Sequence, residues 1–222
     1  MLQDAALTRP QLKTPRAAAI AGIAFSVLLI AMLAMFRSAV PADPLESGAW
    51  LATDSNRAAI ALNLIPFAGV AFLWFIGVLR DRLAHREDRF FATVFLGSGL
   101  LFLAMLFVSA TIIGGLILVS NSLPASDFFN SPTFRLGRAT AFIIMNVYAV
   151  KMAAVFMFST SVVVIKTAIA PRWIAVAGMT LAVFLLVGSY LVSWSVIVLP
   201  LWVLLISGYI LVDNMGIRER LL

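Results

Sequence analysis

Long apolar runs separated by short polar segments make up most of this chain. A helix rises about 1.5 Å per residue, so roughly 20 apolar residues cross about 30 Å of hydrocarbon. The runs predict an all-α fold, a polytopic transmembrane helical bundle of six spans with cytoplasmic N- and C-termini. The spans are 17–36, 58–79, 90–119, 139–165, 173–192 and 196–212. Residues 17–212 are then the membrane domain, 1–16 a cytoplasmic N-terminal segment and 213–222 a cytoplasmic tail.

The six runs are unequal in length. Runs 90–119 and 139–165 exceed one crossing, so their helices must tilt or extend past the bilayer. Run 17–36 is longer than the apolar part of a signal peptide, so we expect it to be retained. Only Ser193, Trp194 and Ser195 separate the last two runs. This gap predicts a tight helical hairpin, and a single broken helix is the alternative.

The composition agrees with a chain dissolved in lipid. Hydrophobic residues make up 63% and charged residues 12%, with a mean hydropathy of +1.06. Soluble domains are about half apolar and a quarter charged. The absence of cysteine excludes disulfides and thiolate ligands. With a single histidine, His85, we expect no metal site, and the sequence suggests no cofactor.

Lysine and arginine are distributed unevenly between the two predicted sides. Eleven lie on the side that carries both termini and four on the other, which predicts that the termini are cytoplasmic. The location is then the cell inner (plasma) membrane, multi-pass. The net charge of +6 reflects this topology and is no reason to expect nucleic-acid binding. The connection after the second run is a cytoplasmic basic loop expected to contact anionic headgroups through Arg80, Arg82, Arg86 and Arg89.

Lys151 lies near the middle of the fourth run, and no apolar run contains an acidic residue. Insertion scales place a central lysine at about +3 kcal/mol. Lys151 could line a wet cavity, lose its charge through desolvation, or pair with a carboxylate of another chain. A helix shifted outward, which brings Lys151 to water, is a further alternative. Tyr148 shares its helical face and could join it in binding an anion or a headgroup, whereas Asn146 points to a different side.

The second run is interrupted by Pro66. Proline removes a backbone donor, so the carbonyl of Leu62 loses its partner and the helix should kink. Asn63, one turn earlier, could satisfy the freed backbone groups or a neighbouring helix. An intramembrane polar site would then combine Asn63 with Lys151, Tyr148 and Asn146, although a purely structural bend explains Asn63 and Pro66 as well.

Segment 120–138 is a predicted outer loop that carries Phe128, Phe129 and Phe134. Aromatic residues in an otherwise polar loop indicate a segment that lies on the membrane surface or dips into the bundle. The alternative is that these phenylalanines only cap the ends of helices.

The sequence contains no arrangement of residues typical of an intramembrane enzyme. There are no paired aspartates within the runs, no serine with a histidine on a span, and no His-Glu-x-x-His for zinc. The loops also lack the acidic clusters that hold a metal on a phosphate. We therefore have no reason to expect a catalytic residue.

Some local motifs resemble known membrane proteins. Gly77, Asp81, Arg82 and Arg86 resemble the loop between the second and third helices of major facilitator transporters, with Ala84 and His85 as departures. Three longer segments are similar to uncharacterised six-helix bacterial integral membrane proteins: 64–83, 87–101 and 169–173, the last with Ala170 inserted into an Ile-Pro-Arg-Trp turn. That resemblance implies a six-helix fold and no established activity.

Two functions remain open. The first is an accessory or structural subunit of a membrane assembly, in which a second membrane protein or another copy of the chain supplies the missing carboxylate. The second is a small transporter or channel for an anion or a proton-coupled solute that uses Lys151. In both, the lipid bilayer and its anionic headgroups surround the protein.

Overall fold

The computed structural model describes residues 14–83, 89–121, 128–167, 169–189 and 195–219. Every regular element among these residues is helical, which confirms the all-α prediction. The elements are α1 (Thr14–Ala39), α2 (Trp50–Asn63), α3 (Ile65–Leu83), α4 (Arg89–Ser120), α6 (Pro132–Ile143), the π-helical turn η1 (Ile144–Ala149), α7 (Val150–Thr167), α8 (Arg172–Gly188), the 3₁₀ turn η3 (Ser195–Ile197) and α9 (Val198–Glu219).

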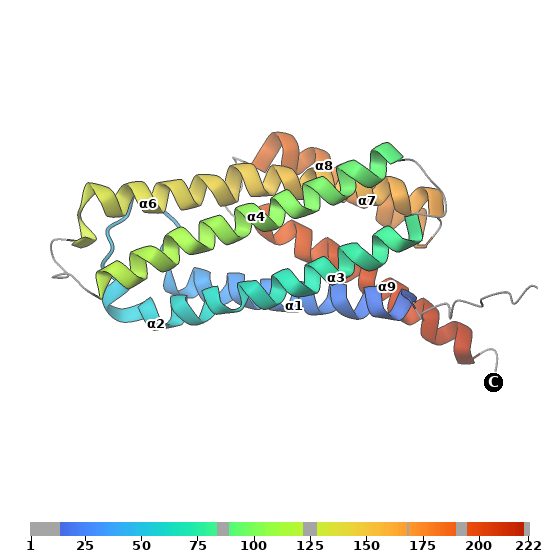
Figure 1. Cartoon of the computed structure of the whole chain (residues 1–222), viewed down its shortest axis with the longest axis horizontal. Coiled ribbons are helices and arrows are strands. Elements are labelled where there is room, and N and C mark those ends of the chain that lie inside the picture. Colours follow the sequence, from blue (N-terminus) through green and yellow to red (C-terminus); the bar gives the residue numbers. More distant parts are fainter. Residues whose placement is uncertain (1–13, 84–88, 122–127, 168, 190–194, 220–222) are drawn as a thin grey trace, which may run out of the picture.

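Five helical stretches are long and apolar enough to cross a membrane: Arg16–Ala39, Trp50–Arg80, Ala92–Ser120, Pro132–Lys166 and Ser195–Asp213. α8 is apolar but has only 17 residues. The chain is therefore compatible with an integral membrane protein of five or six spans, and the count of six stays a prediction. α8 and α9 are separate helices that run in opposite directions, so the last two runs do not form one broken helix (Figure 1).

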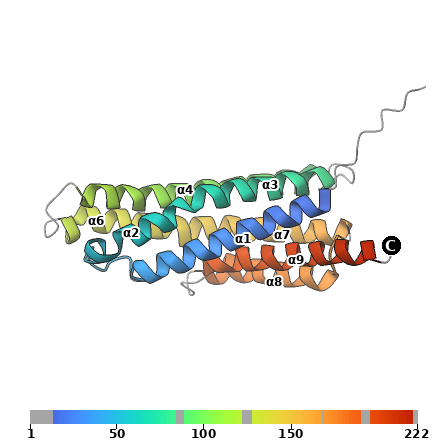
Figure 2. The same cartoon turned by 90° about the horizontal axis from the view of Figure 1, so that it is seen from below.

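The helices lie along the long axis of an elongated bundle (Figures 1 and 2). The starts of α1, α4 and α8 and the ends of α3, α7 and α9 lie at one end. The α1–α2 connection, the end of α4 and the start of α6 lie at the opposite end, which we call the outer end after the predicted topology. The start of α1 and the end of α9 share one end, as the predicted topology requires, and the orientation relative to the cytoplasm stays a prediction from the lysine and arginine count.

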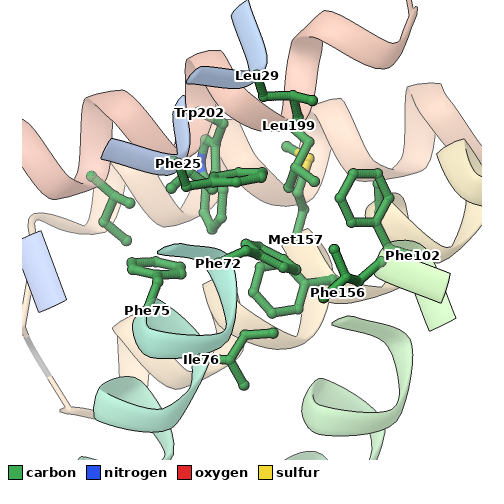
Figure 3. Packing of buried hydrophobic residues seen from close by; sticks show 14 of the residues in the cluster. Phe25, Leu29, Phe72, Phe75, Ile76, Phe102, Phe156, Met157, Leu199 and Trp202 are labelled. Atoms are coloured by element: carbon green, nitrogen blue, oxygen red, sulfur yellow. The ribbon is translucent and has the colours of Figure 1, made fainter. Parts of the chain in front are cut away.

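An aromatic cluster on α1, α3, α4 and α7 forms the centre of the main core. Phe72 of α3 lies at its middle, with ring centroids 4.4 Å from Phe25, 5.1 Å from Phe156 and 5.6 Å from Phe102 (Figure 3). Because lipid tails are as apolar as these rings, the cluster joins the helices by close packing rather than by escape from water.

A second, smaller core lies at the outer end. Phe128 and Phe134 are buried there, with their rings edge to face at 5.7 Å, and Phe129 packs against the cluster. These phenylalanines of segment 120–138 therefore pack into the bundle and do more than cap helix ends. Residues 122–127 of that segment lie outside the described residues.

The helix that contains Pro66 is interrupted where the sequence predicted it. Leu64 separates α2 from α3, and Pro66 is the second residue of α3, a position that needs no backbone donor. The amide Nδ2 of Asn63 donates to the carbonyl of Ala59 at 2.9 Å, so this side chain bonds to its own helix.

Two glycines of α4 provide a matched test of helix packing. A Cβ on Gly99 would lie 2.7 Å from Ile76 Cδ1 and 3.0 Å from the Phe156 ring, whereas a Cβ on Gly97 would meet nothing within 4 Å. We expect Gly99→Leu to lower the free energy of unfolding by about 1–3 kcal/mol through overpacking, and Gly97→Leu to change it little. Unfolding in mixed micelles of mild detergent and dodecyl sulfate measures both, and equal effects would show that α4 does not pack as described.

Candidate functional site

The four polar residues predicted to form an intramembrane site lie in three different places. Lys151 and Tyr148 are exposed on the outside of the bundle, the latter with 55% of its surface accessible. Asn146 is buried, and Asn63 is exposed on α2. Asn146 does point to a different side from Tyr148 and Lys151, as predicted. Of these residues, only Asn146 lines the largely apolar cavity described below.

Lys151 forms no hydrogen bond or ion pair with any part of the chain that the structure describes. It lies fifteen residues before Lys166, which is about 22 Å along a helix. Helical side chains tilt toward the helix N-terminus, which for α7 is the outer end. In the predicted topology, with Lys166 at the inner boundary of about 30 Å of hydrocarbon, Lys151 would lie roughly 8 Å below the outer one. Its amine, on a stem of about 6 Å, would then extend toward the outer headgroups.

Asn63 and Pro66 share a different hollow. They line a surface groove of about 460 Å³ between α2, α3 and α4, together with Phe107, Thr111 and Gly114. The side chain of Thr111 donates to the carbonyl of Phe107 at 2.8 Å, so the polar groups of this groove are largely engaged within their own helices.

The two cores meet around a cavity of about 100 Å³ at the outer end of the bundle. Its wall is mostly apolar and includes Met32, Phe36, Ile65, Ile113, Phe142 and Met145. Its polar lining comes from Arg37, Ser109, Arg138 and Asn146. Ser109 is already engaged, because its hydroxyl donates to the carbonyl of Ala141 at 2.9 Å.

Arg138 is the most unusual residue of this cavity, with only 4% of its surface exposed. Its Nη2 donates to the carbonyl of Pro41 at 2.8 Å, and its Cζ lies 5.8 Å from the centroid of the Trp50 ring. Both contacts suit a cation, because a guanidinium bonds carbonyls strongly and is attracted to an aromatic face. Arg138 thus joins α6 to the α1–α2 connection and to the first turn of α2.

The negative charges that act on this arginine come from the α1–α2 connection. The carboxylates of Asp43 and Glu46 act electrostatically on Arg138, but neither forms an ion pair with it. Asp43 instead accepts from the backbone N–H of Leu45 at 2.8 Å and so fixes the local turn. The backbone N–H of Gly48 donates to the carbonyl of Phe129 at 3.0 Å, which holds this connection against the segment before α6.

Two buried polar atoms of the cavity wall have no hydrogen-bond partner among the described residues. They are Nη1 of Arg138 and Oδ1 of Asn146. The Nδ2 of Asn146 donates to the carbonyl of Phe142 at 3.0 Å, which assigns the free atom as the amide oxygen. A buried polar atom without a partner is costly, so such atoms in a cavity wall indicate a missing companion.

Asn146 occupies a distinctive stretch of backbone. It lies within the π-helical turn η1, between α6 and α7. Such turns widen a helix locally and are frequent at functional sites. The turn places Asn146 on the cavity while the nearby Tyr148 faces outward.

The sequence did not single out Arg138, which was counted only as an outer-side charge. The signal was present, because Phe134, Arg138 and Ala141 follow one another at helical spacing and are the buried residues of α6. An arginine on the apolar stripe of a helix indicates a buried cation. This pattern was hidden because α6 begins at Pro132, seven residues before the predicted start of the span.

The basic loop can be followed only in part. Arg80 is exposed near the end of α3, whereas the side chains of Arg82, Arg86 and Arg89 lie outside the described residues. Across the described ranges, no group of three or more histidine, cysteine, aspartate or glutamate residues could hold a metal ion.

Comparison with known proteins adds no relative. No protein family matches the chain, and neither a curated protein nor a solved structure is significantly similar to it.

Proposed function

We propose that this integral membrane protein is a non-catalytic subunit of a membrane assembly. The observation that carries the proposal is the pair formed by Tyr148 and Lys151, three residues apart and both exposed on the outside of the bundle. A partner helix that offers a carboxylate and an acceptor for the tyrosine hydroxyl would complement both side chains.

The competing companion of Lys151 is the phosphate of an outer-leaflet headgroup. An exposed pair with a headgroup in water contributes little, whereas a charge pair shielded by two chains in lipid is stronger and directional. A partner carboxylate and a headgroup phosphate both suit an amine directed toward the outer surface. Only the partner carboxylate requires a second protein within a few ångströms of Tyr148, and this difference can be measured.

We expect a photoreactive phenylalanine analogue at position 148 to crosslink to protein in native membranes. The same analogue at Trp74, an exposed position of α3 with 69% of its surface accessible, serves as the control that should meet lipid. A product of twice the 24.0 kDa chain identifies a homo-oligomer, and another discrete mass identifies a second protein. Lys151→Met should reduce the product roughly tenfold, which corresponds to about 1.4 kcal/mol, and Lys151→Arg should preserve it.

The proposal fails if positions 148 and 74 both react with lipid alone. It also fails if the chain extracted gently from membranes is a stable, homogeneous monomer. Persistence of the crosslink in Lys151→Met would retain the assembly but remove Lys151 from its interface.

The second candidate is a small transporter or channel for an anion, and the buried Arg138 at the outer cavity favours it. In this function Lys151 acts at the outer approach, since it does not line the cavity. Anion flux into liposomes should then fall in both Lys151→Met and Arg138→Met. Absence of flux for any anion in the unmodified chain would exclude this candidate.

A further inference from the structure

We propose that the cavity at the outer end binds a small amphipathic anion, a carboxylate or phosphate group on a short apolar body. The anionic group would accept from Nη1 of Arg138, and a separate hydroxyl of the same ligand, or the remaining O–H of a hydrogen phosphate, would donate to Oδ1 of Asn146. This site is separate from the Tyr148–Lys151 pair and does not depend on the proposed assembly.

The first argument is the chemistry of the wall. A buried guanidinium needs companions for its donors, and among the described residues Nη2 of Arg138 has one, at the carbonyl of Pro41, whereas Nη1 has none. Arg37 lines the same cavity and adds a second positive charge. Asp43 and Glu46 act on Arg138 without pairing with it, so its Nη1 stays available to an incoming anion.

The second argument is the size and polarity of the space. A cavity of about 100 Å³ is smaller than the roughly 150 Å³ engineered cavity that holds benzene, so it takes only the head and first carbons of a ligand whose chain continues into the adjoining hollow. Its apolar wall includes Phe36, Phe142 and Met145, which match a short hydrocarbon body. A bare inorganic ion would leave this apolar surface uncovered, and a pure hydrocarbon would leave both polar atoms unpaired. A molecule with both parts pairs Nη1 of Arg138 and covers the apolar wall, and a hydroxyl on it also pairs Oδ1 of Asn146.

The third argument is the position of the cavity. It joins the main core to the outer core and includes Val196 and Ile197 of the 3₁₀ turn η3, directly before α9. A larger hollow of about 680 Å³ shares Arg37, Val40 and Pro41 with it and continues toward Trp50 and Asp54. A ligand can therefore place its head at Arg138 while a longer chain extends along this second hollow.

The test uses hexanoate, hexanol and hexylammonium as probes, titrated by calorimetry into the chain in lipid nanodiscs. We expect hexanoate to bind saturably, hexanol to bind at least about tenfold more weakly, and hexylammonium not to bind. Arg138→Met should weaken hexanoate binding at least about tenfold, while Arg135→Met, which removes an exposed arginine of the same helix, should leave it unchanged.

A second variant separates binding from folding. Ala141 is 2% exposed and lines the cavity, so Ala141→Met fills the space without altering a charge. It should abolish hexanoate binding in a chain whose helical circular dichroism is unchanged. Hexadecanoate distinguishes two sources of the ligand: tighter binding than hexanoate indicates a membrane lipid, and equal or weaker binding indicates a short soluble acid.

Three results would overturn the proposal. They are no saturable binding of hexanoate to the unmodified chain, equal binding of hexanol and hexanoate, or hexanoate binding that survives both Arg138→Met and Ala141→Met. Each would mean that the cavity holds only water between Arg138 and Asn146, or that the probe binds elsewhere.

Discussion

Phe72→Ala is expected to lower the free energy of unfolding by about 2–3 kcal/mol, because deleting roughly 100 Å³ leaves a cavity that costs about 24 cal/mol per Å³. Phe72 is fully buried and lies within 4.4–5.6 Å, centroid to centroid, of rings on α1, α4 and α7. In lipid the unfolded helices remain in an apolar solvent, so the lost stability comes from packing rather than from hydration.

The matched control for this variant is Phe67→Ala, which removes the same ring from the same helix. Phe67 has 66% of its surface exposed, so we expect its loss to change the free energy of unfolding by less than about 0.5 kcal/mol. Unfolding in mixed micelles followed by tryptophan fluorescence gives both values. If Phe67→Ala were as destabilising as Phe72→Ala, the central aromatic cluster would not hold α3 against its neighbours.

The elements were predictable because each depends on local properties of the chain. Length and hydropathy place the six helical runs, and Pro66 predicts the interruption that separates α2 from α3. The starts of two helices were less predictable. α2 begins at Trp50, eight residues before the apolar run, and α6 begins at Pro132, seven residues before its run. Both extensions are amphipathic, and both contribute buried residues to the outer core. This core joins distant segments of the chain, which hydropathy cannot reveal.

For the polar residues too, the sequence predicts what depends on neighbouring residues and misses what depends on contacts between distant segments. The opposite orientation of Asn146 relative to Tyr148 and Lys151 follows from helical periodicity. The partner of Arg138 does not, since the carbonyl of Pro41 lies 97 residues away in the sequence. The exposure of Lys151 could not be predicted from the sequence either. An isolated cation in an apolar run can line a cavity or lie on the outer face of the bundle, and the positions of the neighbouring helices decide between them.

Arg138→Met is expected to lower the free energy of unfolding by about 2 kcal/mol, the range for losing a hydrogen bond to a buried charged group. The variant leaves the carbonyl of Pro41 without its donor, removes the cation beside the Trp50 ring, and removes the attraction between Arg138 and the carboxylates of Asp43 and Glu46. Relief of the desolvation of the buried guanidinium offsets part of this loss, which keeps the expected effect below that of breaking a fully buried ion pair.

Arg135→Met supplies the control, because it removes the same charge from an exposed position one turn earlier and should change stability by less than about 0.5 kcal/mol. If electrostatic attraction contributes to the role of Arg138, Arg138→Met should cost less in a Glu46→Gln background, with a coupling of roughly 0.5 kcal/mol. A cost that is unchanged by Glu46→Gln would exclude Glu46 from the effect of Arg138 and leave it to Pro41, Trp50 and Asp43. An Arg138→Met chain as stable as the unmodified one would mean that the buried arginine is kept for the ligand rather than for the fold, since its contacts would then contribute no net stability.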